Sequence, residues 1–472
     1  MSSDDDGRVD QRVKGPQAFR QVRVAKVALV TFSGACLLLV LWVMNAARYL
    51  RPSVDDYCIA ARAGQGVIGG FVQDWQTYSG FVTPSFLTNA LVGVPLVRLP
   101  LWAASAVPFM LGALAMTLFV LVLATRSMTR EPKVRRLLIA LTVAPIAAVS
   151  WWAFLWTSYT ASGQAAPQDV ALAVTHWQNI NTAYVIPVAL IAALGLVLYG
   201  RTFNRGWVAV ACGALLGLAS GLMGPTFALA VVVFAVGLVL TLWLTAPEEA
   251  RRVLARIVSV CLFTAIGLGV SFASPGTHLR MDNNFGVSVG VNSESLPAWI
   301  IRVFPDTYQA WGQAFIHWGT VLVLVVSVAL GSLAIHSGLK FRREVVAPQT
   351  VALLGLSLIL AGATLVGDTV AYGAYWHQTS VQVVVFGATV SMGLWVATEA
   401  RNLAATWWTA LILIVVATGL TCYTGAVIDM TSSIVEREQR WSVGPAPVGD
   451  AIDDRELWGL DQCWQEVLTL RE

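Results

Sequence analysis

The sequence predicts an all-α fold, a polytopic membrane bundle of about eleven transmembrane helices. Of its 472 residues, 57% are hydrophobic and 12% are charged, which is about half the charged fraction of a typical soluble domain. The mean hydropathy of +0.68 agrees with this composition. Lipid is therefore the expected surroundings of most of the chain. No cluster of basic and aromatic residues indicates nucleic-acid binding.

The apolar runs give the expected spans in order, because a helix needs about 20 apolar residues to cross the hydrocarbon core. The first run has no charged residue, is too long for a signal peptide and lacks a small-residue cleavage site. The uncharged stretch 206–246 is long enough for two spans that turn at 221–225. The expected spans are 27–47, 99–125, 137–157, 181–200, 206–222, 225–246, 257–273, 318–339, 346–366, 379–398 and 403–427.

The basic residues predict the orientation. Alternate loops, counted from the N-terminal tail, collect 20 of the 30 Lys and Arg residues on one side, which the positive-inside rule assigns to the cytoplasm. We therefore expect a multi-pass protein of the cytoplasmic membrane with a disordered cytoplasmic tail (1–26), a transmembrane domain (27–428) and an extracytoplasmic tail (429–472). Cys58 and Cys463 both fall outside in this topology, where a disulfide between them is compatible with the redox conditions.

The stretch 75–97 is also uncharged, but a span there would invert the charge pattern of the later loops. It is rich in Gly, Pro, Thr and Asn. We interpret it as interfacial or re-entrant helices on the outer face.

Two adjacent acids, Asp55 and Asp56, follow the first span directly and are the first candidate for chemistry. One interpretation is structural: Pro52 ends the span, Ser53 caps a new helix, and acids suit its first turn. The other is functional, because paired carboxylates at a membrane face suit a metal or a substrate hydroxyl.

Three further outer segments carry polar and aromatic residues. After the acids, Trp75 and Tyr78 recur at helical spacing. One interpretation is that their rings stack on a sugar, and the other is that they belong to an interfacial aromatic belt. The segment 274–280 combines a Pro-Gly turn with His278 and Arg280. It is interpreted either as a phosphate-binding site or as an ordinary loop whose Arg side chain reaches the lipid headgroups. The remaining candidates are His176 and Asn179 at the start of the fourth span, and Asp368, Tyr372, Tyr375 and His377 near the ninth.

The acid pair, the juxtamembrane helix after it and the aromatic outer loops resemble the GT-C glycosyltransferases. The resemblance covers the architecture and, locally, the segments 53–57, 75–80 and 274–280. Many members of that superfamily carry a further acid on a middle outer loop, and the turn 221–225 has none here. There is no HExxH, P-loop or GxGxxG motif.

The resemblance implies an inverting hexosyl- or pentosyltransferase that moves a sugar from a polyprenyl-phosphate donor to an envelope glycan, lipid or protein outside the membrane. Asp55 or Asp56 would be the base, and the other would orient the acceptor or help to hold a divalent cation, Mg²⁺ or Mn²⁺. The implied donor-phosphate residues are Arg280, His278, Arg302 and His377. The implied sugar or acceptor residues are Tyr57, Trp75, Tyr78, His176, Asn179, Asp368, Tyr372 and Tyr375.

Two other classes remain open: a secondary transporter, and a lipid-carrier flippase or other non-catalytic partner of envelope polysaccharide assembly. A transporter usually holds charges at mid-membrane, and the expected spans contain almost none. A flippase accounts for a phosphate-binding Arg but not for the acid pair.

Overall fold

The computed structural model describes residues 16–50, 54–78, 80–129, 132–160, 178, 181–198, 206–279, 311–312, 315, 317–371, 374–400, 406–442, 463, 466–467 and 469–470. Within these ranges, the backbone alone is described at 16–19, 54–55, 101, 157–160, 364–378, 406–407 and 437–442. The described part of the chain is helical, and its one extended pairing is an isolated bridge between Met128 and Phe341.

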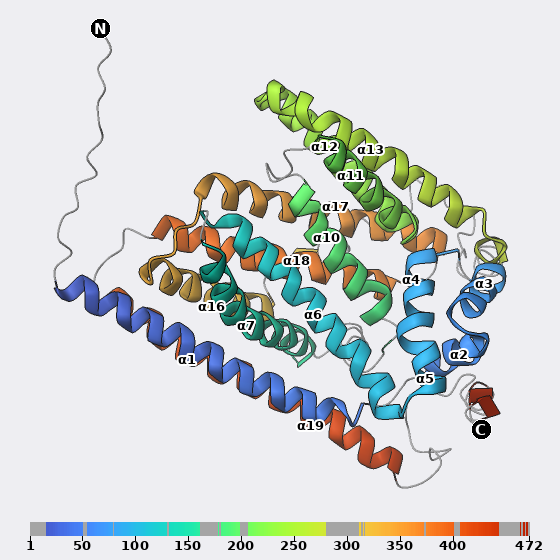
Figure 1. Ribbon diagram of the computed structural model, residues 1–472, viewed down its shortest axis with the longest axis horizontal. Helices are drawn as coiled ribbons and strands as arrows, with labels where there is room; N and C mark the ends of the chain where they lie inside the picture. Colours follow the sequence, from blue (N-terminus) through green and yellow to red (C-terminus); the bar gives the residue numbers. More distant parts are fainter. Residues whose placement is uncertain are drawn as a thin grey trace.

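The long helices confirm a polytopic membrane bundle (Figure 1). Ten helices among the described residues are long and apolar enough to cross a membrane. The fifth expected span is a shorter apolar helix of 16 residues. In chain order the eleven are α1 (Pro16–Ala47), α6 (Leu101–Ser127), α7 (Lys133–Thr160), η3 (Asn181–Val185) continued by α10 (Ile186–Leu198), α11 (Gly206–Gly221), α12 (Pro225–Thr245), α13 (Pro247–Phe272), α16 (Trp318–His336), α17 (Arg343–Ala371), α18 (Ala374–Glu399) and α19 (Thr406–Ser442).

The stretch 75–97 does not form one long helix, in agreement with the sequence analysis. It belongs to a series of elements: α2 (Val54–Arg62), η1 (Ala63–Gln65), α3 (Val67–Thr77), α4 (Val82–Thr88), η2 (Asn89–Gly93) and α5 (Val94–Arg98). The last three follow one another without a break and make one helical stretch of 17 residues. None has the roughly 20 residues that a crossing needs.

The long helices pack through small residues and apolar side chains. On α11, Gly213, Gly217 and Gly221 recur every four residues and face α13. At these positions the backbones of the two helices lie very close together. A Cβ atom added at Gly217 would lie 2.3 Å from the carbonyl oxygen of Val260. Such small-residue stripes let helix backbones approach closely where lipid provides no hydrophobic driving force.

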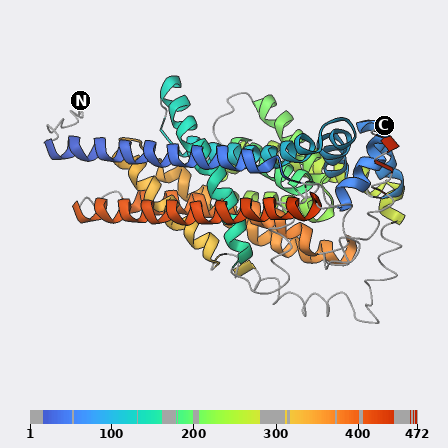
Figure 2. The ribbon, with the colours of Figure 1, turned by 90° about the horizontal axis from the view of Figure 1, so that it is seen from below.

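α1 and α19 run side by side along one flank of the bundle (Figure 2). The indole Nε1 of Trp42 donates a 2.9 Å hydrogen bond to Oγ1 of Thr431 between them. α19 continues without a break to Ser442, so the expected boundary at 428 lies inside a helix.

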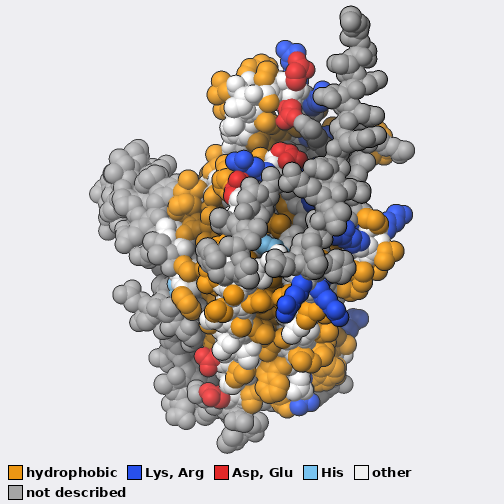
Figure 3. Space-filling view, turned by 90° about the vertical axis from the view of Figure 1, so that its left-hand side faces the viewer, with side chains coloured by type: hydrophobic (Ala, Val, Ile, Leu, Met, Phe, Trp, Pro, Cys, Tyr) orange, Lys and Arg blue, Asp and Glu red, His pale blue; other side chains and the backbone are white. Residues whose placement is uncertain are grey.

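The two ends of the bundle differ in charge. One, which we call the basic end, lies where α1 begins and carries basic residues of the α6–α7 and α16–α17 connections (Figure 3). Arg342 donates from Nη2 to the carbonyl of Arg126 at 3.1 Å, and Arg135 donates to that of Gly338 at 3.2 Å. The opposite end, the site end, holds α2 to α5, the last turns of α13 and the C-terminal segment (Figure 1).

Candidate functional site

The carboxylate of Asp56 is buried where α2 meets the segment that leads into η3. Asp56 is 0% exposed, and its Oδ2 accepts a 3.4 Å hydrogen bond from the backbone N–H of Gln178. A buried carboxylate needs such donors, because transfer out of water disfavours its charged form. The fold therefore brings Asp56 of the acid pair to Gln178, which lies between the sequence candidates His176 and Asn179 in the chain.

The side-chain amide of Gln178 is buried as well. Gln178 is 1% exposed, and its Nε2 and Oε1 atoms have no hydrogen-bond partner in the described part of the chain. The adjacent turn is fixed, since Thr182 Oγ1 donates to the Gln178 carbonyl at 3.0 Å and Asn181 Nδ2 donates to that of Pro108 at 2.8 Å. Buried amides without partners are rare, and this one can bind a water or a ligand hydroxyl.

A second buried carboxylate, that of Asp74 in α3, organises the short helices around it. Its Oδ1 lies 2.6 Å from Nε of Arg62 at the end of α2. Its Oδ2 accepts hydrogen bonds from Ser85 Oγ at 2.6 Å and from Asn89 Nδ2 at 2.7 Å. The side chains of Asp74 and Arg62 are 4% and 22% exposed. Four short elements, α2, α3, α4 and η2, are thus joined by one ion pair and its hydrogen bonds.

Sequence reasoning passed over this cluster. Asp74, Arg62 and Asn89 are not among the candidates that the sequence suggested. The available signal was weak: two opposite charges close in sequence within a stretch that is otherwise almost uncharged.

Three of the five aromatic candidates have described side chains, and these lie in different surroundings. Tyr57 is 1% exposed and packs in a small apolar core with Ala60, Val92 and Leu96, so its ring offers no open face to a sugar in this structure. Trp75 is half-buried. Tyr78 is 50% exposed, and the Arg62 guanidinium carbon lies 5.0 Å from its ring centroid, so a cation covers one face of that ring.

The segment after α13 holds the turn between α3 and α4. Ser274 Oγ donates to the carbonyl of Trp75, and Thr277 Oγ1 accepts the N–H of Gly80 at 2.9 Å. The contact requires glycine, because a Cβ atom at Gly80 would lie 2.0 Å from the carbonyl oxygen of Ser271. The segments 75–80 and 274–280, both singled out in the sequence, therefore meet. His278 is exposed beside this junction.

Several predicted residues lie outside what the structure describes. Asp55, Asp368, Tyr375 and His377 fall in α2, α17 and α18, where only the backbone is described. The others, outside the described residues altogether, are Arg280, Arg302, His176, Asn179 and Tyr372. Among the described residues, no group of three or more His, Cys, Asp or Glu side chains could hold a metal ion.

The C-terminal segment packs onto α2 and completes the site end. Cys463 forms a disulfide with Cys58, and the two Cα atoms are 4.9 Å apart. Val467 is 0% exposed in the same apolar core as Tyr57, and Leu470 lies against Gly64. Cys463, Val467 and Leu470 are thus part of the structure around α2.

The site end therefore holds a buried carboxylate, a buried amide without a partner among the described residues, and an exposed histidine, from three segments far apart in sequence. The chain matches no protein-family model, no curated protein and no solved structure.

Proposed function

We propose that this chain is a membrane glycosyltransferase of the GT-C type, which transfers a sugar from a polyprenyl-phosphate donor to an acceptor outside the cytoplasmic membrane. One observation carries the proposal: Asp56 is buried against the main chain of Gln178 at the site end, next to an amide that has no partner among the described residues. An acid pair that served only as a helix cap would not need to meet a segment 122 positions away.

The two acids take different roles in this proposal. The Asp56 carboxylate is occupied by the N–H of Gln178, so Asp56 positions the start of α2 and the amide beside it. Asp55 is the base. It removes the proton of the acceptor hydroxyl, whose oxygen forms a bond to the anomeric carbon. The bond from that carbon to the phosphate oxygen breaks, and the polyprenyl phosphate leaves with the electron pair. A single displacement of this kind inverts the anomeric configuration.

The leaving phosphate needs positive charge as its own charge develops. We assign this role to Arg280 with His278, assisted by Arg302 or His377. Support comes from the junction of Ser274 and Thr277 with Trp75 and Gly80, which holds the segment that leads to Arg280 at the same end of the bundle as α2. A divalent cation, Mg²⁺ or Mn²⁺, remains an alternative source of this charge.

We place the site end outside the cell and the basic end in the cytoplasm. The distribution of basic loops supports this orientation, and so does the Cys58–Cys463 disulfide at the site end. Structural disulfides persist in oxidising surroundings and are rare in the cytosol.

A comparison of envelope glycans tests the proposed function. The gene is deleted and then restored, and released glycans, glycolipids and glycoproteins are analysed by mass spectrometry. We expect one sugar linkage to disappear in the deletion strain and the unmodified acceptor to accumulate outside the membrane. Accumulation of the acceptor or of the sugar-loaded carrier on the cytoplasmic side would instead identify a flippase or transporter.

A further inference from the structure

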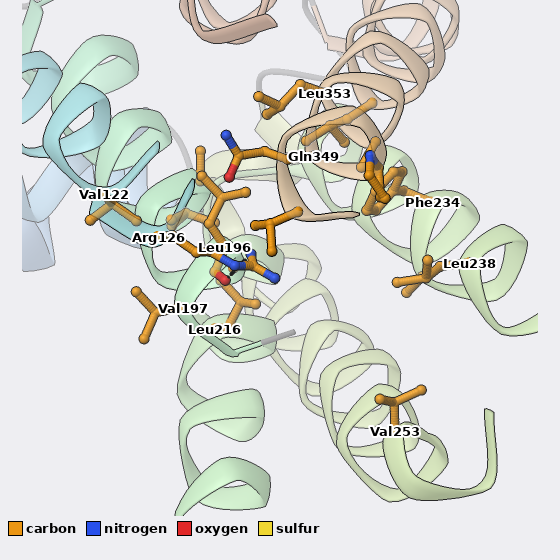
Figure 4. Close-up of a pocket in the computed structure, with 18 of the residues that line it drawn as sticks. Val122, Arg126, Leu196, Val197, Leu216, Phe234, Leu238, Val253, Gln349 and Leu353 are labelled. Atoms are coloured by element: carbon orange, nitrogen blue, oxygen red, sulfur yellow. Dashed lines mark hydrogen bonds between the residues drawn. The ribbon is translucent and has the colours of Figure 1, made fainter. Parts of the chain in front are cut away.

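A large cavity lies at the basic end, away from the site described above (Figure 4). Its volume is about 1120 Å³, and it extends between α6, α10, α12, α13 and α17. Small-molecule sites usually have volumes of roughly 300–1,000 Å³, so this space is sufficient for a large ligand.

One side of the cavity is an apolar wall with the length of a lipid chain. α12 contributes Phe227, Val231, Phe234, Leu238 and Leu242, which recur along one helix face. From Phe227 to Leu242 the helix rises about 22 Å. Leu353 of α17 stands across from this wall (Figure 4).

The opening at the basic end is lined by five arginines: Arg126, Arg136, Arg252, Arg256 and Arg342. Arg126 and Arg256 are half-buried, and the other three are exposed. Two acids, Glu249 and Glu344, also line the cavity, so the lining carries three more positive than negative charges (five minus two).

Among the described residues, these guanidinium groups have no carboxylate partner. In the described part of the chain, no ion pair joins any of the five to an acid. Three of them donate to main-chain carbonyls: Arg126 to Leu196, Arg256 to Leu198 at 2.9 Å, and Arg342 to Arg126 at 3.1 Å. Positive charge that is partly removed from water and unpaired favours an anionic ligand.

A buried acceptor deeper in the cavity also lacks a partner. Gln349 is 4% exposed and lines the cavity, and its Nε2 donates to Ser391 Oγ at 3.1 Å. Its Oε1 has no hydrogen-bond partner among the described residues. A ligand hydroxyl or water would satisfy this acceptor.

We propose that this cavity is a binding site for a membrane lipid with an anionic phosphate headgroup. The phosphate binds between Arg126, Arg256 and Arg342, and a hydrocarbon chain lies along α12. Guanidinium groups bind phosphate oxygens through paired hydrogen bonds, and basic pockets between membrane helices are a recurrent form of lipid headgroup site. The proposal rests on the cavity alone and is independent of glycosyl transfer at the site end.

General attraction of basic loops to the membrane surface is the competing explanation, and it predicts no defined site. Native mass spectrometry separates the two. The full chain is delipidated in detergent and titrated with phosphatidylglycerol, with phosphatidylcholine in a parallel series. We expect one phosphatidylglycerol to bind with at least about tenfold preference over phosphatidylcholine, and soluble glycerol phosphate not to displace it. Displacement by glycerol phosphate at similar concentration would show a site for free anions and overturn the lipid assignment.

Two variants and a matched control locate the site. The double variant Arg126→Gln/Arg256→Gln should weaken phosphatidylglycerol binding by roughly tenfold or more, because each arginine supplies charge-assisted hydrogen bonds. Leu238→Trp keeps every charge and should also expel the lipid by filling the apolar wall. The control Lys133→Gln/Arg251→Gln removes two exposed charges at the same end that do not line the cavity, and it should bind as the wild type does. Equal binding by all four proteins, or no bound lipid in the wild type, would overturn the proposal.

Discussion

Cys58 in α2 and Cys463 near the C-terminus are joined by a disulfide that connects residues 405 positions apart. The bond fixes the C-terminal segment against the helix that carries Asp55 and Asp56. Val467 and Tyr57 share the apolar core beside it. The stability of α2 therefore depends on residues at both ends of the chain.

Loss of this disulfide should lower stability and release the C-terminal segment. A cross-link that closes a long loop typically contributes about 2–4 kcal/mol. Cys58→Ser should lower the melting temperature in detergent and expose the segment to protease, as should reductant on the wild type. Cys212→Ser, at a free cysteine on α11, is the control. Equal melting temperatures of Cys58→Ser and the control would contradict this account.

Removal of the Asp74 carboxylate should destabilise the short helices strongly. Asp74→Ala leaves Arg62 largely buried without its partner and removes the acceptor of Ser85 and Asn89. Breaking a buried pair in this way costs about 3 kcal/mol or more. Glu248→Ala removes an exposed acid 3.8 Å from Arg251 and should change stability by less than about 1 kcal/mol. Chemical denaturation of both variants would measure the difference, and similar midpoints would show that the cluster contributes little.

Gly80→Ala should disrupt the junction between the α3–α4 turn and Ser274. The added Cβ atom would lie 2.0 Å from the Ser271 carbonyl oxygen and 2.4 Å from Thr277 Oγ1. The Ser271 carbonyl belongs to the backbone, so it cannot move aside as the end of a flexible side chain can. Gly34→Ala on α1 is the matched control, since a Cβ atom there has no neighbour within 4 Å and alanine favours the helix. Thermal melting should show a loss for the first and none for the second. A neutral Gly80→Ala would mean that the two segments do not touch.

His317 should make stability dependent on pH near neutrality. Its Nδ1 accepts the N–H of Gly319 at 3.2 Å and caps α16, and burial lowers the pKa of the imidazole below its ordinary value of 6.5. The unfolded chain therefore binds more protons between the two pKa values. The contribution of this cap is present above pH 6.5 and is lost as the pH falls through and below that value. His317→Asn keeps a capping acceptor and should flatten this part of the stability profile, which denaturation at a series of pH values would measure.

The spans could be predicted from sequence because lipid imposes a length and a composition on each helix. The interruption of 75–97 followed from its Pro and Gly residues and from the charges of the flanking loops. Helix ends were less accurate: α13 begins at Pro247, ten residues before the predicted span, because its first turns are amphipathic and contain Arg251 and Arg252.

The site end could be predicted only as a set of candidates, since its contacts join residues far apart in sequence. The sequence carries no sign that Asp56 meets Gln178 or that Ser274 meets Trp75. It also did not distinguish the faces of α2, where Tyr57 and Ile59 are buried although both lie in a short, polar helix. Tyr57 is buried because α5 and the C-terminal segment pack against it, and the sequence of α2 alone does not show this packing.

The central claim is that Asp55 acts as the base in sugar transfer, in the position that Asp56 helps to fix. The most direct measurement is transfer from a polyprenyl-phosphate sugar by the purified protein in proteoliposomes, compared between the wild type, Asp55→Asn and Asp429→Asn, an exposed acid on α19. We predict that Asp55→Asn lowers the rate about 100-fold or more, because a general base typically contributes this much, while its melting temperature and the rate of Asp429→Asn stay at wild-type values. An Asp55→Asn protein that folds normally and transfers the sugar at the wild-type rate would contradict the account.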